Sequence, residues 1–395
     1  MSDAASRQHH GVSQRAFLIA LLLIAANLRP SLTGVGPLLE TIRADLRLSA
    51  TAAGWLGSSP LLMFAAFAPL ARLARQLGAE RLVLAGLVVL IAGIVVRSAG
   101  GVVPLFAGTV ALAAGIAGIN VLIPALVKQH YPERVPGITT TYATVMGGFA
   151  ALASGVAVPL ANWLPGGWRS SLASWALLAA IGLLFWLPQV RNPAKPPRDA
   201  QSAATSHPLP WRNRIAWQIT GFMGLQSTFF YIAISWFPAV LRESGYSPAA
   251  GGWLLTLFQA AALLAGLTVP FLIRRFRDQR ALAFCMASLL TLGTLGILFA
   301  PAAAALWMIV LGCGAGPSLI LALSFMGLRA ANQQMAAALS LMSQSIGYLV
   351  AACGPILFGL IHDYTGTWTA PLLVTAGLTI VQGLCGVGAG RGTCR

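Results

Sequence analysis

The sequence predicts an all-α membrane protein with about twelve transmembrane helices in two similar six-helix halves. Two observations predict this class. Of the 395 residues, 57% are hydrophobic and only 9% are charged, and the mean hydropathy is +0.78, whereas a soluble domain carries about 25% charged residues. Apolar runs of roughly 20 residues recur along the chain, and each is long enough to cross a hydrocarbon core of about 30 Å as a helix.

The order of the apolar runs divides the chain into two halves. A proline-rich and basic stretch, QVRNPAKPPRDAQSAATSHPLPWRNR, is the only linker-like segment. It gives a tail at 1–15, an N-terminal half at 16–188, a linker at 189–214, a C-terminal half at 215–388 and a tail at 389–395. The first apolar stretch is too long for a signal peptide, so we expect it to remain as the first span. The predicted spans are 16–39, 50–71, 81–99, 102–127, 138–160, 170–188, 215–240, 248–272, 280–299, 302–327, 336–360 and 368–388.

The placement of basic residues predicts the orientation. With a cytoplasmic N-terminus, about nineteen of the 25 Lys and Arg residues fall on the cytoplasmic side. We therefore expect both termini in the cytoplasm and the protein in the cytoplasmic (inner) membrane. Because the basic residues occupy alternate loops rather than one face, the net charge of +16 does not indicate a nucleic-acid partner. The residues left on the opposite side are Arg43, Arg47, Arg97, Arg169 and Arg242.

The sequence shows no sign of an enzyme. The five cysteines are scattered without the spacing of metal ligands, and no nucleophile–base pair is visible. We expect no metal and no cofactor, and we expect the chain to act as a monomer whose partners are the lipid bilayer and a small-molecule substrate.

Arg29, in the stretch AANLRPSLTGVGP, is the one charged residue that we place near the middle of the membrane. A central charge costs at least ~2.5 kcal/mol on insertion scales and usually marks a substrate pathway. The guanidinium stays charged, and its planar fork suits a carboxylate or another small anion. The alternative is an arginine that binds backbone carbonyls and braces a kink. We favour the ligand, because no carboxylate is predicted inside the membrane to neutralise Arg29.

Pro30 predicts an interruption of the first helix beside Arg29. Proline removes the N–H that would bond the carbonyl of Ala26, and it biases the preceding residue away from helical geometry. Asn27 falls roughly opposite Arg29 on helical spacing. We therefore expect Asn27 to make a structural hydrogen bond rather than to bind the ligand.

Other intramembrane polar residues are few. In the eleventh span, Ser340, Gln344 and Tyr348 recur at every fourth residue and so form one stripe. Such groups could surround a polar ligand, or they could be hydrogen bonds between helices, which are worth on average ~0.6 kcal/mol. With Arg29, the candidate ligand residues are Asn120, Gln226, Tyr231, Gln344 and Tyr348.

Five blocks of the sequence resemble the cyanate permease and 2-nitroimidazole exporter family of the major facilitator superfamily. They are NLRPSLTGVGPLL, GINVLIPALVKQHYPERV, GLQSTFFYIAISWFPAVL, PFLIRRFRDQR and AALSLMSQSIGYLVAACGPILFGLIHDYTGTW. The resemblance implies a carrier of twelve helices that opens alternately to each side, with helices 1, 4, 7 and 10 around the cavity. Arg29, Asn120 and Gln226 would then lie on cavity-lining helices.

The loop after the second span departs from the usual superfamily signature. In LARQLGAER, Arg75 stands about where the signature has an aspartate. The matching loop in the second half, IRRFRDQR, contains Arg274 and Arg275. We assign these three arginines, with Asn27 and Pro30, to structure or gating.

The first functional hypothesis is a secondary transporter of a small anion, cyanate-like or carboxylate-like, bound by Arg29. The alternative is an exporter of neutral, planar heteroaromatic compounds such as 2-nitroimidazoles. A membrane sensor that transports nothing is a third possibility, and it lacks support because no sizeable soluble domain is visible.

Overall fold

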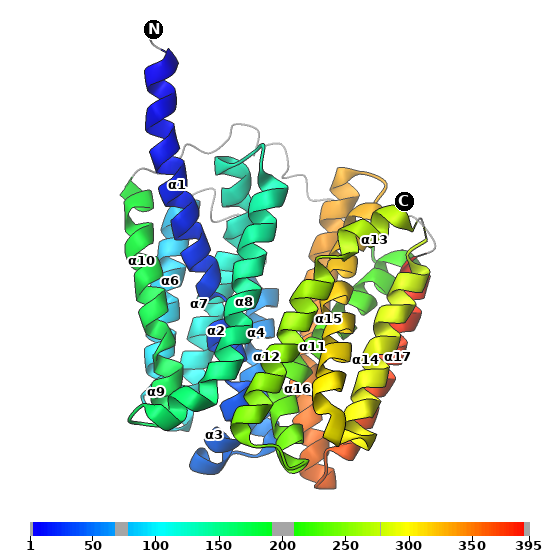
Figure 1. Ribbon diagram of the computed structural model, residues 1–395. Helices are drawn as coiled ribbons and strands as arrows, with labels where there is room; N and C mark the ends of the chain where they lie inside the picture. The colour runs from blue at the N-terminus through cyan, green and yellow to red at the C-terminus, as the bar shows by residue number, and fades with distance from the viewer. Residues whose placement is uncertain (1–2, 68–77, 192–208, 277, 391–395) are drawn as a thin grey trace.

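The structure, a computed structural model, describes residues 3–67, 78–191, 209–276 and 278–390. These residues form helices and no strands (Figure 1). Arg75 and most of the predicted linker at 189–214 lie outside the described residues. The first group of helices contains α1 (Asp3–Asn27), α2 (Pro30–Thr33), the 3-10 helix η1 (Gly36–Leu38), α3 (Leu39–Leu46), α4 (Ala50–Phe67), α6 (Ala79–Ser98), α7 (Val102–His130), α8 (Val135–Trp163), α9 (Trp168–Ala173) and α10 (Trp175–Arg191).

The second group begins after the linker. It stands beside the first group, and the start of α1 and the end of α17 lie at the same end of the molecule (Figure 1). We call this the termini end. The group contains α11 (Arg214–Glu243), α12 (Pro248–Gly266), α13 (Val269–Arg275), α14 (Arg280–Phe299), the 3-10 helix η3 (Pro301–Ala303), α15 (Ala304–Leu328), α16 (Gln333–Thr365) and α17 (Thr369–Ala389).

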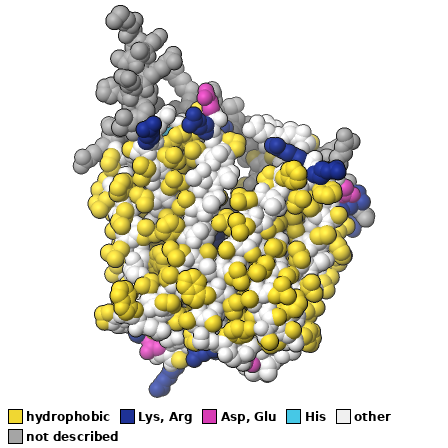
Figure 2. Space-filling model, viewed as in Figure 1, with side chains coloured by type: hydrophobic (Ala, Val, Ile, Leu, Met, Phe, Trp, Pro, Cys, Tyr) yellow, Lys and Arg dark blue, Asp and Glu magenta, His cyan; other side chains and the backbone are white. Residues whose placement is uncertain are grey.

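Twelve helical segments in the described residues are long and apolar enough to cross a membrane, which confirms the predicted number. The first of them, Gln14–Leu46, contains the part of α1 from Gln14 onward together with α2, η1 and α3. Apolar side chains cover the middle of the molecular surface, and Lys and Arg gather at its two ends (Figure 2). Such a belt matches the hydrocarbon core of a bilayer, within which only helices satisfy every backbone group of a single segment.

The interruption predicted at Pro30 is present. Helix α1 ends at Asn27 and α2 begins at Pro30. Arg29 between them has φ −122° and ψ −36°, whereas an α-helix has about −63° and −42°. The confirmed break follows from the backbone N–H that proline lacks and from its steric conflict with the preceding turn.

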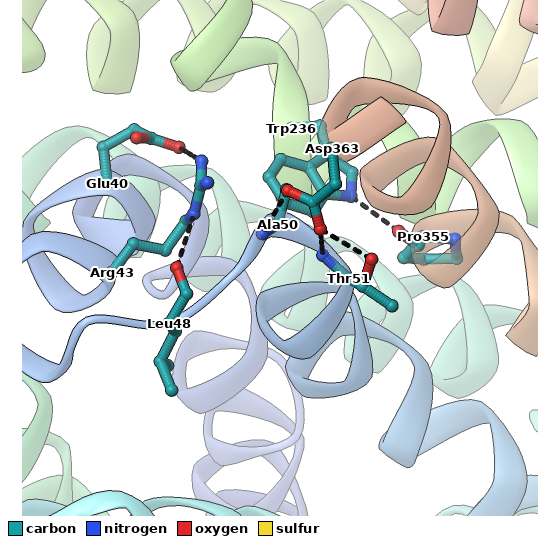
Figure 3. A network of polar contacts seen from close by, with 8 residues as sticks. All are labelled: Glu40, Arg43, Leu48, Ala50, Thr51, Trp236, Pro355 and Asp363. Atoms are coloured by element: carbon teal, nitrogen blue, oxygen red, sulfur yellow. Dashed lines mark hydrogen bonds and ion pairs between the residues drawn. The ribbon is translucent and has the colours of Figure 1, made fainter. Parts of the chain in front are cut away.

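Small residues bring the two halves together at the end opposite the termini, which we call the sealed end. Here α4 packs on α16, and a Cβ atom added to Gly54 or Gly359 would clash with backbone atoms of Pro355 or Ala50. Trp236 of α11 donates to the carbonyl of Pro355 at 2.9 Å, and its side chain is fully buried (Figure 3). Small residues such as Gly54 and Gly359 allow the backbones of neighbouring membrane helices to pack closely.

Helices α8 and α12 make the second contact between the halves. Thr256 of α12 donates to the carbonyl of Ala151 in α8 at 2.7 Å, and Gln259 donates to Ser154 Oγ at the same distance. The packing of α8 on α12 reaches Gly147, where an added Cβ would lie 3.2 Å from Leu263 Cδ1, whereas a Cβ added to Gly137 would meet nothing within 4 Å. The two halves are therefore joined through α4 with α16 and through α8 with α12.

Candidate functional site

Arg29 lies at the junction of the two halves. The break between α1 and α2 places its guanidinium against α11, where Nη1 donates to the hydroxyl oxygen of Tyr231 at 3.2 Å. The side chain is partly exposed. Among the described residues, no carboxylate lies within 4 Å of Arg29. The guanidinium therefore has a neutral phenol as its hydrogen-bond partner and retains an uncompensated charge.

Two tyrosines accompany Arg29. Tyr231 is only 4% exposed, and the partly exposed Tyr348 of α16 lies close enough to interact electrostatically with both Arg29 and Tyr231. The ring of Tyr348 also meets Phe64 of α4, with centroids 5.7 Å apart. The structure thus brings together three of the predicted ligand residues, one from the first half and two from the second.

The two glutamines are engaged within their own helices. Gln226 is 4% exposed and donates to Ser227 Oγ at 2.7 Å. Gln344 is partly exposed and donates to Ser340 Oγ at 2.7 Å, one turn before Tyr348. Asn120 in α7 is partly exposed. Within the described part of the chain, no hydrogen bond joins any of these three side chains to Arg29.

Asn27 is turned away from the arginine. Its amide donates to the carbonyl of Leu23 at 2.8 Å and to that of Leu178 in α10 at 3.2 Å. This hydrogen bond ties the end of α1 to a neighbouring helix just before the break. Arg274 and Arg275 lie exposed at the end of α13, and Arg75 lies outside the described residues.

A second arginine, Arg97, was not anticipated as an interior residue. The sequence placed it at the outer end of the predicted span 81–99, and the structure buries it near the end of α6 with 1% of its surface exposed. Glu80 at the start of α6 is also buried, so Arg29 is not the one charged side chain in the interior. Arg97 Nη1 donates to the carbonyl of Ser31 at 2.6 Å, whereas Nε and Nη2 have no hydrogen-bond partner.

Arg97 forms a hydrogen bond with a backbone carbonyl that the break in the first span leaves without a helical partner. The N–H of Val35 bonds the carbonyl of Leu32 rather than that of Ser31, so the chain tightens into a 3-10 turn. The carbonyl of Ser31 then takes its hydrogen bond from Arg97. Bracing a kink through a backbone carbonyl, which the sequence left open as a role for Arg29, is performed by Arg97.

A small cavity separates Arg97 from the Arg29–Tyr231 pair. Its volume is about 10 Å³, which is room for roughly one water-sized body. Four helices contribute polar side chains to it, and no carboxylate is among its described lining residues. The cavity is lined by Ser31, Leu32, Val35, Leu56, Gly57, Pro60, Arg97, Thr109, Tyr231, Ile234 and Ser235.

Two bundles of membrane helices with a charged site at their junction define a membrane carrier, in which the site lies between the repeats. The sequence model of the Major Facilitator Superfamily matches residues 17–352. The chain belongs to this family and is a multi-pass membrane transporter.

Three relatives are similar over nearly the whole chain. The uncharacterized transporter YycB of Bacillus subtilis (strain 168) is 45% identical over 97% of this chain and 96% of its own. The 2-nitroimidazole transporter of Escherichia coli (strain K12) is 41% identical, with 96% and 97% covered. The cyanate transport protein CynX of the same organism is 28% identical, with 92% and 95% covered.

A solved structure shares the fold. The crystal structure of a bacterial homolog to the human lysosomal transporter Spinster, in an inward-facing and unoccupied conformation, matches with a TM-score of 0.81. The two sequences are 15% identical, and the match covers 96% of this chain and 97% of the other. At this identity the similarity shows the major facilitator fold and no more.

Proposed function

We propose that this transporter carries a small anion, such as cyanate or a small carboxylate, by alternating access, and that Arg29 binds the anion. The observation that carries the proposal is the uncompensated charge of Arg29 at the junction of the halves, where its hydrogen-bond partner is a neutral phenol. A permanently charged, planar guanidinium without a carboxylate favours an anionic ligand that offers oxygen or nitrogen acceptors.

The neighbouring tyrosines support this assignment. Tyr231 and Tyr348 belong to the second half and Arg29 to the first, so an anion on Arg29 would contact both halves together. A ligand that bonds to both halves stabilises the conformations in which they close around it.

A second candidate is a neutral, planar heteroaromatic compound that carries a nitro group. The 41% identical relative is named a 2-nitroimidazole transporter. A nitro group presents two acceptor oxygens in one plane, as a carboxylate does, and the rings of Tyr348 and Phe64 lie beside the site to receive an aromatic ligand.

Uptake into proteoliposomes tests the role of Arg29. A hydrogen bond to a charged group contributes about 1.5–3 kcal/mol, so Arg29→Gln should weaken anion transport by about 10-fold to 150-fold. Arg29→Lys keeps the charge and loses the fork, so it should retain part of the activity. Arg242→Gln, an exposed arginine at the end of α11, is the matched control and should transport normally.

The outcomes separate the candidates. Unchanged anion transport in both Arg29 variants would show that the arginine is structural and would refute the proposal. A thermal-shift screen of the purified wild type, with cyanate and small carboxylates against nitroimidazoles, then identifies the ligand class. Stabilisation by the heterocycles alone would replace the first candidate with the second.

A further inference from the structure

The cavity beside Arg97 has the properties of an anion site separate from Arg29. We propose that it binds one monatomic anion, a halide such as chloride, between Arg97 and Tyr231. The proposal goes beyond the transported substrate, since it concerns a second ligand on the sealed side of Arg29.

The charge of Arg97 requires compensation. The side chain is 1% exposed, and its Nε and Nη2 groups have no hydrogen-bond partner. Burying an unpaired charge is strongly unfavourable unless a counter-charge or several hydrogen bonds satisfy it. One backbone carbonyl, that of Ser31, satisfies a single N–H of the guanidinium.

No described carboxylate supplies this counter-charge. Glu80 is on the same helix but 17 residues earlier, about 25 Å away at 1.5 Å per residue. At the sealed end, Asp45 pairs with Arg169 at 2.8 Å and Glu40 pairs with Arg43 at 2.7 Å. None of the ion pairs among the described residues includes Arg97, so a mobile anion is the simplest source of charge.

The polar groups around the cavity are suited to an anion. Tyr231 accepts its hydrogen bond from Arg29, so the proton of its own hydroxyl remains available to a ligand in the cavity. The Nε and Nη2 nitrogens of Arg97 are further donors, and Ser235 adds a hydroxyl. A water molecule needs acceptors as well as donors, whereas an anion is stabilised by donors alone.

The size of the cavity selects the kind of anion. A volume of about 10 Å³ holds one water-sized body. A monatomic anion is closer to this size than cyanate or a carboxylate, each of which contains several bonded heavy atoms. The packing of α6 against α7 fixes the position of Arg97, because a Cβ added to Gly108 would clash with the Arg97 backbone.

Crystallography in bromide locates the anion. Crystals of the full-length carrier grown in bromide should give an anomalous peak within hydrogen-bonding distance of Arg97 Nε or Nη2. Absence of a peak at Arg97, or a peak at Arg29 instead, would overturn the proposal, because the cavity would then hold water only or the halide would belong to the transport site.

Thermal unfolding supplies a second readout. In detergent at constant ionic strength, replacing gluconate by chloride or bromide should raise the melting temperature of the wild type by about 2–4 °C. Arg97→Met should abolish this shift, whereas Arg242→Gln and Arg29→Gln should keep it. A halide shift that persists in Arg97→Met would contradict the site. Should Arg97→Met fail to fold, the bromide peak in the wild type decides.

Discussion

Asp363 of α16 caps the first turn of α4 across the boundary between the halves. One carboxylate oxygen accepts the backbone N–H of Ala50 at 2.9 Å, and the other accepts the N–H and the hydroxyl of Thr51 at 2.8 and 2.6 Å (Figure 3). Beside it, Arg43 of the first half lies over the ring of Trp236 of the second, 5.9 Å from the centroid. A carboxylate at a helix N-terminus accepts hydrogen bonds from backbone N–H groups that have no partner within the helix. The contacts of Asp363 and Arg43 therefore join the two halves at the sealed end.

Asp363→Asn should shift the carrier toward conformations open at the sealed end. An amide keeps one acceptor oxygen and loses the charge, so about 1–3 kcal/mol of the contact is lost, and the population of the open form should rise by about 5-fold to 150-fold. Distances between spin labels on α4 and α16 measure this population. Glu133→Gln, an exposed carboxylate at the termini end, is the control. Equal distance distributions in wild type and Asp363→Asn would contradict the assignment.

Gly108→Ala should destabilise the first half. Its new Cβ would clash with the backbone of Arg97, and flexible side-chain motion cannot relieve a contact between two helix backbones. Overpacking of this kind costs about 1–3 kcal/mol, so the melting temperature should fall. Gly148→Ala in α8 is the matched control, because its Cβ would meet nothing within 4 Å. The prediction fails if the two variants melt at the same temperature.

The hydropathy of the sequence was sufficient to predict the number of membrane-spanning helices. Each apolar run has only one way to satisfy its backbone in a bilayer, so its length and composition determine a helix. The break at Pro30 was equally local, since it follows from a missing N–H. Arg29 beside that break could therefore be recognised as unusual before any contact with Tyr231 was known.

The burial of Arg97 could not be predicted from local sequence. It stands one residue before the end of α6, where the predicted span 81–99 places it at the outer surface of the membrane. Its burial depends on Gly108 of α7, which lets two helix backbones meet, and on a carbonyl freed in the first span. The hydrogen-bond partners of Gln226 and Gln344 could not be predicted either, because the rotation of a helix about its axis determines which neighbours a polar side chain faces.

Pro30→Ala should impair substrate binding more than folding. Alanine restores an N–H that can bond the carbonyl of Ala26, so the helix can continue through Arg29 and redirect its guanidinium. Misplacement of a binding group by about 1 Å costs up to about 100-fold, so the apparent affinity for the transported anion should fall by about 10-fold to 100-fold. The melting temperature should change little, because Pro30 is the first residue of α2 and replacing proline at a compatible position changes stability by only about 0.4–1 kcal/mol.

Pro188→Ala is the matched control for this variant, since Pro188 is exposed within α10 and belongs to no part of the site. It should leave transport kinetics unchanged. Similar affinities in Pro30→Ala and the wild type would show that the break does not position Arg29.

Anion movement through this carrier should depend on substrate on the opposite side. Moving a monovalent anion inward against an inside-negative potential costs ~2.3 kcal/mol per 100 mV. An empty site would expose the uncompensated charge of Arg29 to desolvation as the halves close, so only the loaded carrier should reorient readily. Proteoliposomes preloaded with unlabelled substrate should therefore take up labelled substrate at least about 10-fold faster than empty ones, which corresponds to about 1.4 kcal/mol. Equal rates would exclude obligatory exchange and would favour passage of a neutral ligand, for which Arg29 serves as a hydrogen-bond donor.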